Sequence, residues 1–406
     1  MTEPLSEEWC RHHFDYLSHD LAPALPETLK RLRSTCPITH SDAHGGYWIV
    51  TNYEDVLQVA QDWETFSSAY GLAVGGNGKR DTVVRNLPVG TDPPEQRFFK
   101  RLINPYFTPS AVARYEKPIR GLARRLIDAF IADGRCDFMD SFARPFPNLA
   151  FFEQVLGAPP GELEKVSTLA SVASVPDHPD RRAGWQGLHD WIQALLEQRR
   201  QEPPRSDVVD AVLAARLDDG APLPEGDMIG IIQLLILGGL ETTAGALGLM
   251  FHRFCSQPEI PAQLREQPER IPKAVEELLR LDGPFLAVAR TTTRSVQLGG
   301  MDVPAGEKVL LYWASADRDD AQFSNPDAFD LERERNPHLA FGAGPHRCAG
   351  SNFARLNLRI ALEELLQRLD DIQLEERAEV HFHSTLTRAP LHLPVTFRRR
   401  EAFSAA

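Results

Sequence analysis

The sequence predicts a mainly α-helical protein with small β-sheets. Apolar residues recur at helical spacing between proline-rich breaks through residues 105–225. An apolar run over residues 228–251 is long enough for one central helix, and short β-branched and aromatic runs at 47–51 and 309–313 indicate minor sheets. The length of 406 residues allows one to three domains, and we expect residues 1–406 to form a single domain.

Charge, cysteine usage and missing motifs exclude several classes of function. The 44 lysines and arginines are outnumbered by 57 aspartates and glutamates, and the net charge of −13 opposes binding to nucleic acid. The five cysteines are scattered, without CxxC or zinc-ligand spacing, as is usual in a reducing compartment. GxSxG, HExxH and GxxxxGK motifs are absent, and the acidic N-terminus lacks a leader segment. We therefore expect a cytoplasmic, monomeric protein without a membrane anchor.

The first quarter of the chain contains a candidate lid. A β-rich run at 47–51 is followed by Asn52, a residue type that caps helices, so a strand and then a helix are expected. Residues 66–90 are a long glycine-rich stretch, which predicts either disorder or a functional lid. An aspartate and two prolines then signal a helix start, and Gln96 and Lys100 lie one turn apart on that helix. A binding role for this pair has a solvated helix face as its alternative.

The apolar run at 228–251 is interrupted by polar residues near its middle. Its length suits a membrane span, but Glu241 would cost about 3 kcal/mol at the centre of a bilayer, so we favour a buried helix. Gly238 and the glycine after it each weaken a helix by roughly 1 kcal/mol, and they lie directly before Glu241 and Thr242. Polar groups at a weak point of an apolar helix indicate function, whereas we expect Thr243 to bond back to a helix carbonyl.

After this helix the sequence predicts an ion pair and more β-structure. Glu277 and Arg280 face each other three residues apart on a helix, and such a pair on a surface usually contributes under about 1 kcal/mol. The run at 285–290 is apolar and strand-like and ends at Arg290. Residues 384–387 have the composition of a β-turn tip.

Residues 341–350 form a glycine-rich loop that contains Cys348 and directly precedes an amphipathic helix. The helix dipole and the free N–H groups at such a position stabilise negative sulfur, which predicts a lowered thiol pKa. Gly342, Gly344 and Gly350 remove Cβ atoms that would keep a flat cofactor away. An axial thiolate on haem iron needs this setting. Taken alone, the loop also fits a plain turn with a small buried cysteine, a nucleophile or a redox switch.

The ten residues from Phe341 to Gly350 match without departure the pattern Phe-Gly-x-Gly-x-His-x-Cys-x-Gly of the cytochrome P-450 family. Residues 238–242 match that family's oxygen-side helix pattern, Ala/Gly-Gly-x-Asp/Glu-Thr, and residues 277–280 match its Glu-x-x-Arg pattern. The motifs occur in the family's order, and the resemblance covers nearly the whole chain. It implies a triangular helical prism enclosing haem b, and the chain is similar to the soluble, ferredoxin-dependent bacterial branch.

The resemblance implies roles for residues around the haem, which is iron protoporphyrin IX. Cys348 is the expected axial iron ligand, and Thr242 and Glu241 are expected to deliver protons to dioxygen, the co-substrate. Gln96 and Lys100 stand where many relatives have His and Arg, and as expected contacts of a haem propionate they keep the hydrogen-bonding capacity of that pair. The expected cofactor-binding residues are Cys348, His346, Arg290, Gln96, Lys100, Phe341, Gly342, Gly350 and Gly238.

The resemblance also implies an apolar substrate pocket roofed by residues 66–90. A terpenoid, a steroid or another hydrophobic small molecule suits its expected lining, which is Leu234, Leu237, Gly238, Phe285, Leu286, Val288 and Leu386. Arg80 and Arg85 near the roof could hold a substrate carboxylate, although solvated loop charges explain them better. The residues expected to support the fold alone are Glu277, Arg280 and Arg333.

The function that the resemblance implies is that of a haem-thiolate monooxygenase, which activates dioxygen with external electrons and hydroxylates a C–H bond. The chain has no flavin or iron–sulfur motif, so a ferredoxin and an NAD(P)H-dependent ferredoxin reductase are expected as partners. An acidic ferredoxin would dock on a basic patch formed by Arg97, Lys100, Arg101, Arg347 and Arg355. A peroxide-using peroxygenase on the same fold and a non-catalytic haem-binding sensor or carrier are the alternatives.

Overall fold

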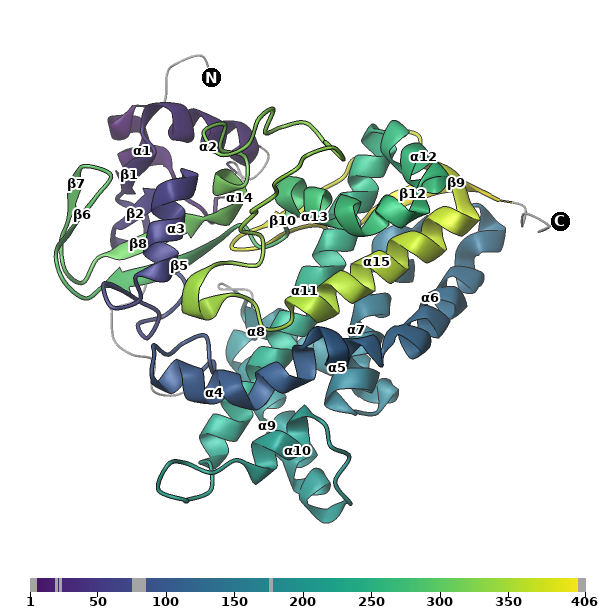
Figure 1. The fold of residues 1–406 in the computed structure, drawn as a ribbon, viewed down its shortest axis with the longest axis horizontal. Helices are drawn as coiled ribbons and strands as arrows, with labels where there is room; N and C mark the ends of the chain where they lie inside the picture. The colour runs from purple at the N-terminus through teal and green to yellow at the C-terminus, as the bar shows by residue number, and fades with distance from the viewer. Residues whose placement is uncertain (1–5, 19–20, 22–23, 75–84, 175–177, 401–406) are drawn as a thin grey trace.

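The computed structural model describes residues 6–18, 21, 24–74, 85–174 and 178–400 (Figure 1). The middle of the expected roof, residues 75–84 with Arg80, lies outside these ranges. The chain forms mainly helices with several small sheets, as predicted. In Figure 1 the largest sheet lies on one side of the molecule with α1, α2 and α3, and most of the longer helices lie on the other side.

Helices are the commonest elements among the described residues, and the predicted helical regions 105–225 and 228–251 are confirmed, except that the first also contains the short strand β4 (Arg135–Asp137). Wide single turns at Met139–Ala143 and Phe152–Leu156 flank α7, an irregularity that the periodicity did not predict. The helices are α1 (Glu7–His13), α2 (Leu25–Thr35), α3 (Tyr53–Gln61), α4 (Glu95–Ile103), α5 (Pro109–Ala113), α6 (Glu116–Phe130), α7 (Pro145–Phe151), α8 (Leu163–Ser174), α9 (Arg181–Gln201), α10 (Val208–Ala214), α11 (Glu225–Ser256), α12 (Glu259–Glu266), α13 (Ile271–Asp282), α14 (Trp313–Ala316) and α15 (Ser351–Arg368).

The strands form one mixed sheet and three small antiparallel ones. The mixed sheet has the order β1-β2-β8-β5-β3, in which β2 and β8 run parallel and every other pair is antiparallel. Its strands are β1 (Ile38–Ser41), β2 (Tyr47–Val50), β8 (Lys308–Tyr312), β5 (Ala287–Thr292) and β3 (Phe66–Ser67). The others are the sheet β4 (Arg135–Asp137), β12 (Pro394–Arg399) and β9 (Leu369–Leu374) and the hairpins β6 (Val296–Leu298) with β7 (Met301–Val303) and β10 (Phe382–Ser384) with β11 (Arg388–Pro390).

Helix α11 passes through the centre of the helical region and contacts α7, α9, α13, α15 and β11. Leu247, Met250 and Phe251 on this helix are fully buried, and the Phe251 ring stacks on Phe138 at 3.7 Å. Among the described residues α11 is the one helix long and apolar enough to cross a membrane, but 67% of its most apolar window is buried inside the protein. It therefore packs as a core helix, as the acidic residue in its middle predicted.

Helix α13 carries the predicted ion pair, and the pair is buried rather than on the surface. Arg280 donates two hydrogen bonds to the Glu277 carboxylate, at 2.8 and 2.9 Å, and Arg333 donates to the same group at 3.2 Å. Arg280 also donates to the carbonyls of Asp317 and Pro326. Removing one partner from such a buried pair costs roughly 3–5 kcal/mol of folding free energy. The contribution of under about 1 kcal/mol that is usual for a surface pair therefore does not apply. These bonds hold the irregular segment that leads to the cysteine loop against α13.

Candidate active site

The cysteine loop places Cys348 just before the first turn of α15, which begins at Ser351. Gly342 and Gly344 have φ angles of +67° and +65°, a left-handed conformation that glycine adopts without strain. The Cys348 N–H donates to the Phe341 carbonyl at 2.8 Å and closes the loop. The predicted position of the cysteine at a helix N-terminus is confirmed.

The loop glycines serve different purposes. A Cβ at Gly344 would lie 2.3 Å from the Ala60 carbonyl oxygen, so this glycine lets the loop pack against α3 and does not clear room for a cofactor, contrary to our expectation. A Cβ at Gly350 would have only the Cys348 Sγ within reach, at 4.0 Å, and the Cys348 side chain is exposed. Open space therefore adjoins the sulfur.

The thiol of Cys348 is less acidic than the helix-dipole argument predicted. Protein atoms packed around the sulfur disfavour the charged thiolate and raise the pKa of the thiol. They do so even though the Cys348 side chain is exposed at the surface of the loop. The N–H of Gly350 and the charges of Lys100, Arg347 and Arg355 lower that pKa without overcoming burial. Bonding to a metal ion deprotonates a thiol outright, so a thiolate here would depend on the metal.

Two buried groups near the loop lack an anionic partner. Arg290 on β5 is 3% exposed and makes no ion pair with a described residue, and one of its N–H groups donates to the Ala289 carbonyl at 2.9 Å. Burial lowers the pKa of Arg290 to about 10, although the charge of Asp92 acts to raise it. The His346 Nε2 atom is buried without a hydrogen-bond partner, and burial together with the charges of Arg290 and Lys100 lowers the pKa of His346 to about 3. An anion between Arg290 and His346 would satisfy both.

Gln96 and Lys100 on α4 contact the cysteine loop itself. The Gln96 Nε2 donates to the Pro345 carbonyl at 2.6 Å. The Lys100 Nζ donates to the carbonyls of Pro345, at 2.7 Å, and Arg347, at 2.6 Å. The side chains of Gln96 and Lys100 therefore bond the loop backbone and do not lie on a solvated helix face. Their contact with a propionate stays a prediction.

The polar motif of α11 lies on an open face in the middle of this core helix. A Cβ at Gly238 would meet no atom within 4 Å, whereas one at Gly239 would lie 2.9 Å from the Phe151 ring. The Thr242 hydroxyl donates to the Gly238 carbonyl at 2.9 Å, so the bond back to the helix that we expected of the next threonine belongs to Thr242. Glu241 is exposed on the same open face, yet the surrounding protein raises its pKa, and the charge of Arg144 lowers it in part.

Comparison with known proteins identifies the family to which the chain belongs. A family model of cytochrome P-450 matches residues 166–391. The nocardicin C N-oxygenase of Nocardia uniformis subsp. tsuyamanensis is 36% identical over 86% of this chain and 89% of its own length. Cytochrome P-450 130 of Mycobacterium tuberculosis is 32% identical over 93% of this chain and 98% of its own length. The chain belongs to the cytochrome P-450 family.

Solved cytochromes P-450 share the whole architecture. The structure of CYP109Q5 from Chondromyces apiculatus has a TM-score of 0.85 at 30% identity and covers 97% of this chain and 100% of that chain. This cytochrome P-450 is a haem-thiolate monooxygenase, as the cysteine loop and the α11 motif predicted. The family implies a haem, and the donors here fit one: an exposed sulfur beside open space, a buried Arg290 without an anion and the unpaired His346 Nε2.

The expected pocket residues of this cytochrome P-450 come from three segments, two of which the structure brings together. A β-bridge joins Phe285 to Thr387, and the Leu286 N–H donates to the Leu386 carbonyl at 2.7 Å. The turn tip at 384–387 therefore lies beside the start of β5. Leu286 and Val288 are buried in separate apolar clusters, whereas the third segment, on α11, leaves its expected pocket residues partly or fully open, namely Leu234, Leu237 and Gly238.

Several contacts around this cytochrome P-450 site were missed from the sequence. The Ala289 N–H on β5 donates to the Leu72 carbonyl at 2.7 Å, so the start of the roof segment runs beside the expected pocket strand. Lys308 anchors the same segment through the Tyr70 carbonyl at 2.7 Å, and burial lowers the pKa of Lys308 to about 8. Arg144 is the cation whose charge acts on Glu241. No local pattern marks these residues, because each contact joins segments far apart in the sequence.

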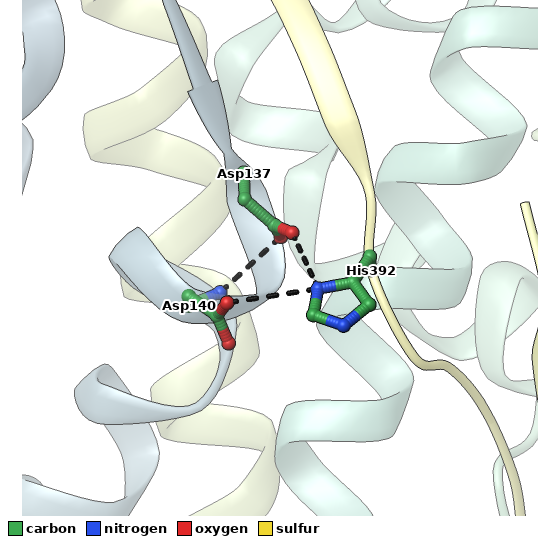
Figure 2. Close-up of side chains that lie close together, drawn as sticks. All are labelled: Asp137, Asp140 and His392. Atoms are coloured by element: carbon green, nitrogen blue, oxygen red, sulfur yellow. Dashed lines mark hydrogen bonds and ion pairs between the residues drawn. The ribbon is translucent and has the colours of Figure 1, made fainter. Parts of the chain in front are cut away.

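A second group of polar side chains lies on β4 and its neighbours, apart from the cysteine loop (Figure 2). Asp137, Asp140 and His392 place one ligand atom each within 4.8 Å of one another, a spacing that a metal ion could use. The His392 Nδ1 already hydrogen-bonds Asp137 at 2.8 Å, and Asp140 pairs with Arg144. Asp137 also accepts the N–H groups of Met139 and Leu393. These bonds join the loop before β12 to β4, and nothing beyond the spacing indicates an ion.

Proposed function

We propose that this cytochrome P-450 holds haem b with Cys348 as the axial ligand and hydroxylates a C–H bond of a hydrophobic small molecule. Dioxygen is the co-substrate, and the electrons come from a separate protein. The observation that carries the proposal is the exposed sulfur of Cys348 together with two buried groups, Arg290 without an ion pair to a described residue and the unpartnered Nε2 of His346. In a bound haem the iron would bond the sulfur, and the propionate carboxylates would accept hydrogen bonds from Arg290 and His346.

When bound, the haem supplies the oxygen-activating chemistry, and the protein supplies binding and orientation. Arg290 and His346 would donate to the propionates, and the guanidinium of Arg290 would give the charge-assisted contact. Gln96 and Lys100 fix the loop through its carbonyls, so that Cys348 keeps one position. Gly238 leaves open space on the α11 side of the site, where no atom lies within 4 Å of the position a Cβ would take.

Proton delivery is assigned to the α11 motif. The Thr242 hydroxyl, which now donates to the Gly238 carbonyl, borders the open space at Gly238 and can turn to donate there. The raised pKa of Glu241 lies closer to neutral pH, and a group transfers protons most effectively when its pKa is near the working pH. The Thr242 hydroxyl therefore donates the proton, and the Glu241 carboxyl group supplies the proton that replaces it.

The substrate and the partners follow from the surfaces around this site. Partly open Leu234, Leu237 and Leu386 favour an apolar substrate such as a terpenoid or a steroid. We assign electron supply to an acidic ferredoxin with its NAD(P)H-dependent reductase. Further proposals are that residues 1–406 form one domain and that the protein is cytoplasmic and monomeric.

Replacing Thr242 by Ala tests the reaction. An apolar substrate is first found by screening terpenoids and steroids for the high-spin shift of the haem Soret band. With a surrogate ferredoxin system, the wild type should couple NADH to product, whereas Thr242→Ala should still consume NADH but release peroxide, with product yield reduced roughly tenfold or more. Thr243→Ala, one residue along the same helix, should remain coupled.

The same assay separates the alternatives. Equal yields in the wild type and Thr242→Ala, with product formed from added peroxide and no electron donor, would indicate a peroxygenase. A sensor or carrier would bind haem and form no product in either variant.

The haem ligand has its own test. The reduced wild-type protein with carbon monoxide should give the long-wavelength Soret band typical of thiolate ligation. Cys348→Ser removes the thiolate and should abolish that band even where haem remains bound. A variant that retained the band would exclude Cys348 as the ligand.

A further inference from the structure

A cation lies on the aromatic ring at the start of the cysteine loop. The Arg355 guanidinium, on the second turn of α15, is 4.4 Å from the centroid of the Phe341 ring. Such a cation–π contact is attractive, and it strengthens as the two groups lose contact with water. Arg355 was expected to present its charge to a redox partner, but this side chain is turned onto the ring instead.

A carboxylate holds Arg355 in that position. Glu276, on α13 beside the buried Glu277, accepts two hydrogen bonds from Arg355, both at 2.7 Å, in the bidentate geometry that fixes a guanidinium. His338 contacts the same carboxylate at 3.1 Å through Nε2, while its Nδ1 accepts the Ala340 N–H. Burial would raise the pKa of Glu276, but the bonds from His338 and Arg355 lower it to about 2, so the pair is fully charged at neutral pH.

This arrangement is joined to the sulfur through the loop backbone. The Phe341 carbonyl accepts the N–H of Cys348 at 2.8 Å, so the residue under the guanidinium and the candidate iron ligand move together. Arg355 lies on the Phe341 ring and Glu276 is bonded to Arg355. Removing either partner of the Glu276–Arg355 pair would therefore leave one uncompensated charge beside the residue that holds the Cys348 backbone.

We propose that the Glu276–Arg355 pair is a positioning and charge-balancing device for Cys348: it seats Phe341 and sets the reduction potential of the bound haem. The proposal rests on haem ligation by Cys348. Glu276 and Arg355 act through the loop, because Arg355 packs on Phe341 and Glu276 is bonded to Arg355. Groups that contact a metal's ligand rather than the metal itself tune the metal by orienting and electrically biasing that ligand.

The sign of each effect follows from Coulomb's law. Reduction adds an electron, and a nearby positive charge stabilises the reduced form. Glu276→Gln leaves Arg355 unbalanced, so the haem potential should rise. Arg355→Gln leaves Glu276 unbalanced, so the potential should fall. The double variant restores charge balance and should return toward the wild-type potential, because the two effects are coupled through one pair.

The test is a dithionite titration of the haem-loaded full-length protein, followed by the Soret band. Arg359→Gln and Glu363→Gln are the controls, since they remove the same charges from an ion-pair network with Glu116 and Arg120 further along α15, and both should leave the potential unchanged. Opposite shifts for Glu276→Gln and Arg355→Gln support the proposal. Shifts in the same direction, or none, would overturn it, because a purely structural role has no reason to change sign with the charge removed.

The stacking component is tested by Arg355→Lys. Lysine keeps the charge but lacks the planar fork that pairs bidentately and covers a ring. The potential should stay near that of the wild type, while the thiolate-type carbonyl band converts faster on standing to the short-wavelength form of a lost thiolate. An unchanged band lifetime would refute the seating role. A wild-type protein without the thiolate band would instead refute haem ligation by Cys348, so the two failures are distinguishable.

Discussion

Asp317 is a carboxyl group enclosed by protein, next to the segment that leads into the cysteine loop. Its Oδ1 accepts the Leu339 N–H at 2.5 Å, and the side chain is 1% exposed. Burial raises the pKa of Asp317 to about 7, which outweighs the opposing effects of His338, the Leu339 N–H, Arg280 and Arg318. The group is therefore partly protonated at neutral pH.

This pKa links folding stability to pH. The unfolded carboxyl group has a pKa of 3.8 and the folded one about 7, so between these values the folded protein binds more protons than the unfolded chain. Its contribution to stability is present below pH 3.8 and is lost as pH rises through 7, by up to about 4 kcal/mol. Asp317→Asn removes the titration.

Urea unfolding of the wild type and Asp317→Asn across this interval measures the effect. We expect the wild type to lose stability relative to the variant as pH rises toward 7. A constant difference between the two proteins across the interval would show that Asp317 is ionised throughout.

The sequence was sufficient to select the candidate site residues, but not to predict the pKa values or the hydrogen-bond partners that the fold gives them. The loop pattern named Cys348 and His346 without a structure, and the strand-like run at 285–290 together with the family resemblance named Arg290. The direction of the thiol pKa was wrong, since desolvation depends on packing from distant segments. The partner of Arg355 was missed for the same reason: Glu276 is 79 residues away in the sequence.

At the scale of elements, the last part of the expected roof, residues 85–90, is docked onto α11. A Cβ at Gly230 would lie 2.1 Å from the Arg85 carbonyl oxygen, so α11 and this segment touch along their backbones. Gln233 donates to Asn86 at 2.9 Å, and Arg85 pairs with Asp227 at 3.0 Å. Arg85 is therefore neither a solvated charge nor free for a substrate carboxylate, and both expectations for it were wrong.

Gly230→Ala tests this contact. The added methyl group cannot fit without moving one backbone, and overpacking of this kind costs about 1–3 kcal/mol of folding free energy. Gly226→Ala is the matched control, because a Cβ there meets nothing within 4 Å on the same helix. Urea denaturation should show a loss of stability in Gly230→Ala and none in Gly226→Ala. Equal stability of the two variants would contradict the close approach.

Elements with a strong local pattern were predicted, and their mutual contacts were not. The apolar period identified α11, and the leucine spacing after the cysteine loop identified α15. Asn52 precedes α3 as expected, but its side chain bonds Asp55 and not the backbone of the first turn. The wide turns on either side of α7 and the docking of the last part of the roof on Gly230 depend on packing partners that no window of sequence contains.

The distribution of charge belongs to the whole molecule. The protein carries a net charge of −13, yet α4 and the cysteine loop lie together through the bond from Lys100 to the Arg347 carbonyl. Arg97, Arg101 and Arg347 are exposed there, and none forms an ion pair with a described residue. Of the five residues expected in the basic patch, Lys100 is committed to loop carbonyls and Arg355 to Glu276. Three arginines therefore remain to attract an acidic partner.

Steering by these arginines predicts a salt dependence of electron transfer. Opposite charges speed the encounter of two proteins by roughly 10- to 1,000-fold, and salt screens them beyond about 10 Å at 0.1 M. The rate of haem reduction by an acidic ferredoxin, followed by stopped flow under carbon monoxide, should fall as salt is added. Arg97→Gln with Arg101→Gln should lower the rate at low salt and flatten its salt dependence. Arg399→Gln on β12, which lies across the molecule from α4 in Figure 1, should change neither, and a wild-type rate unaffected by salt would exclude this docking site.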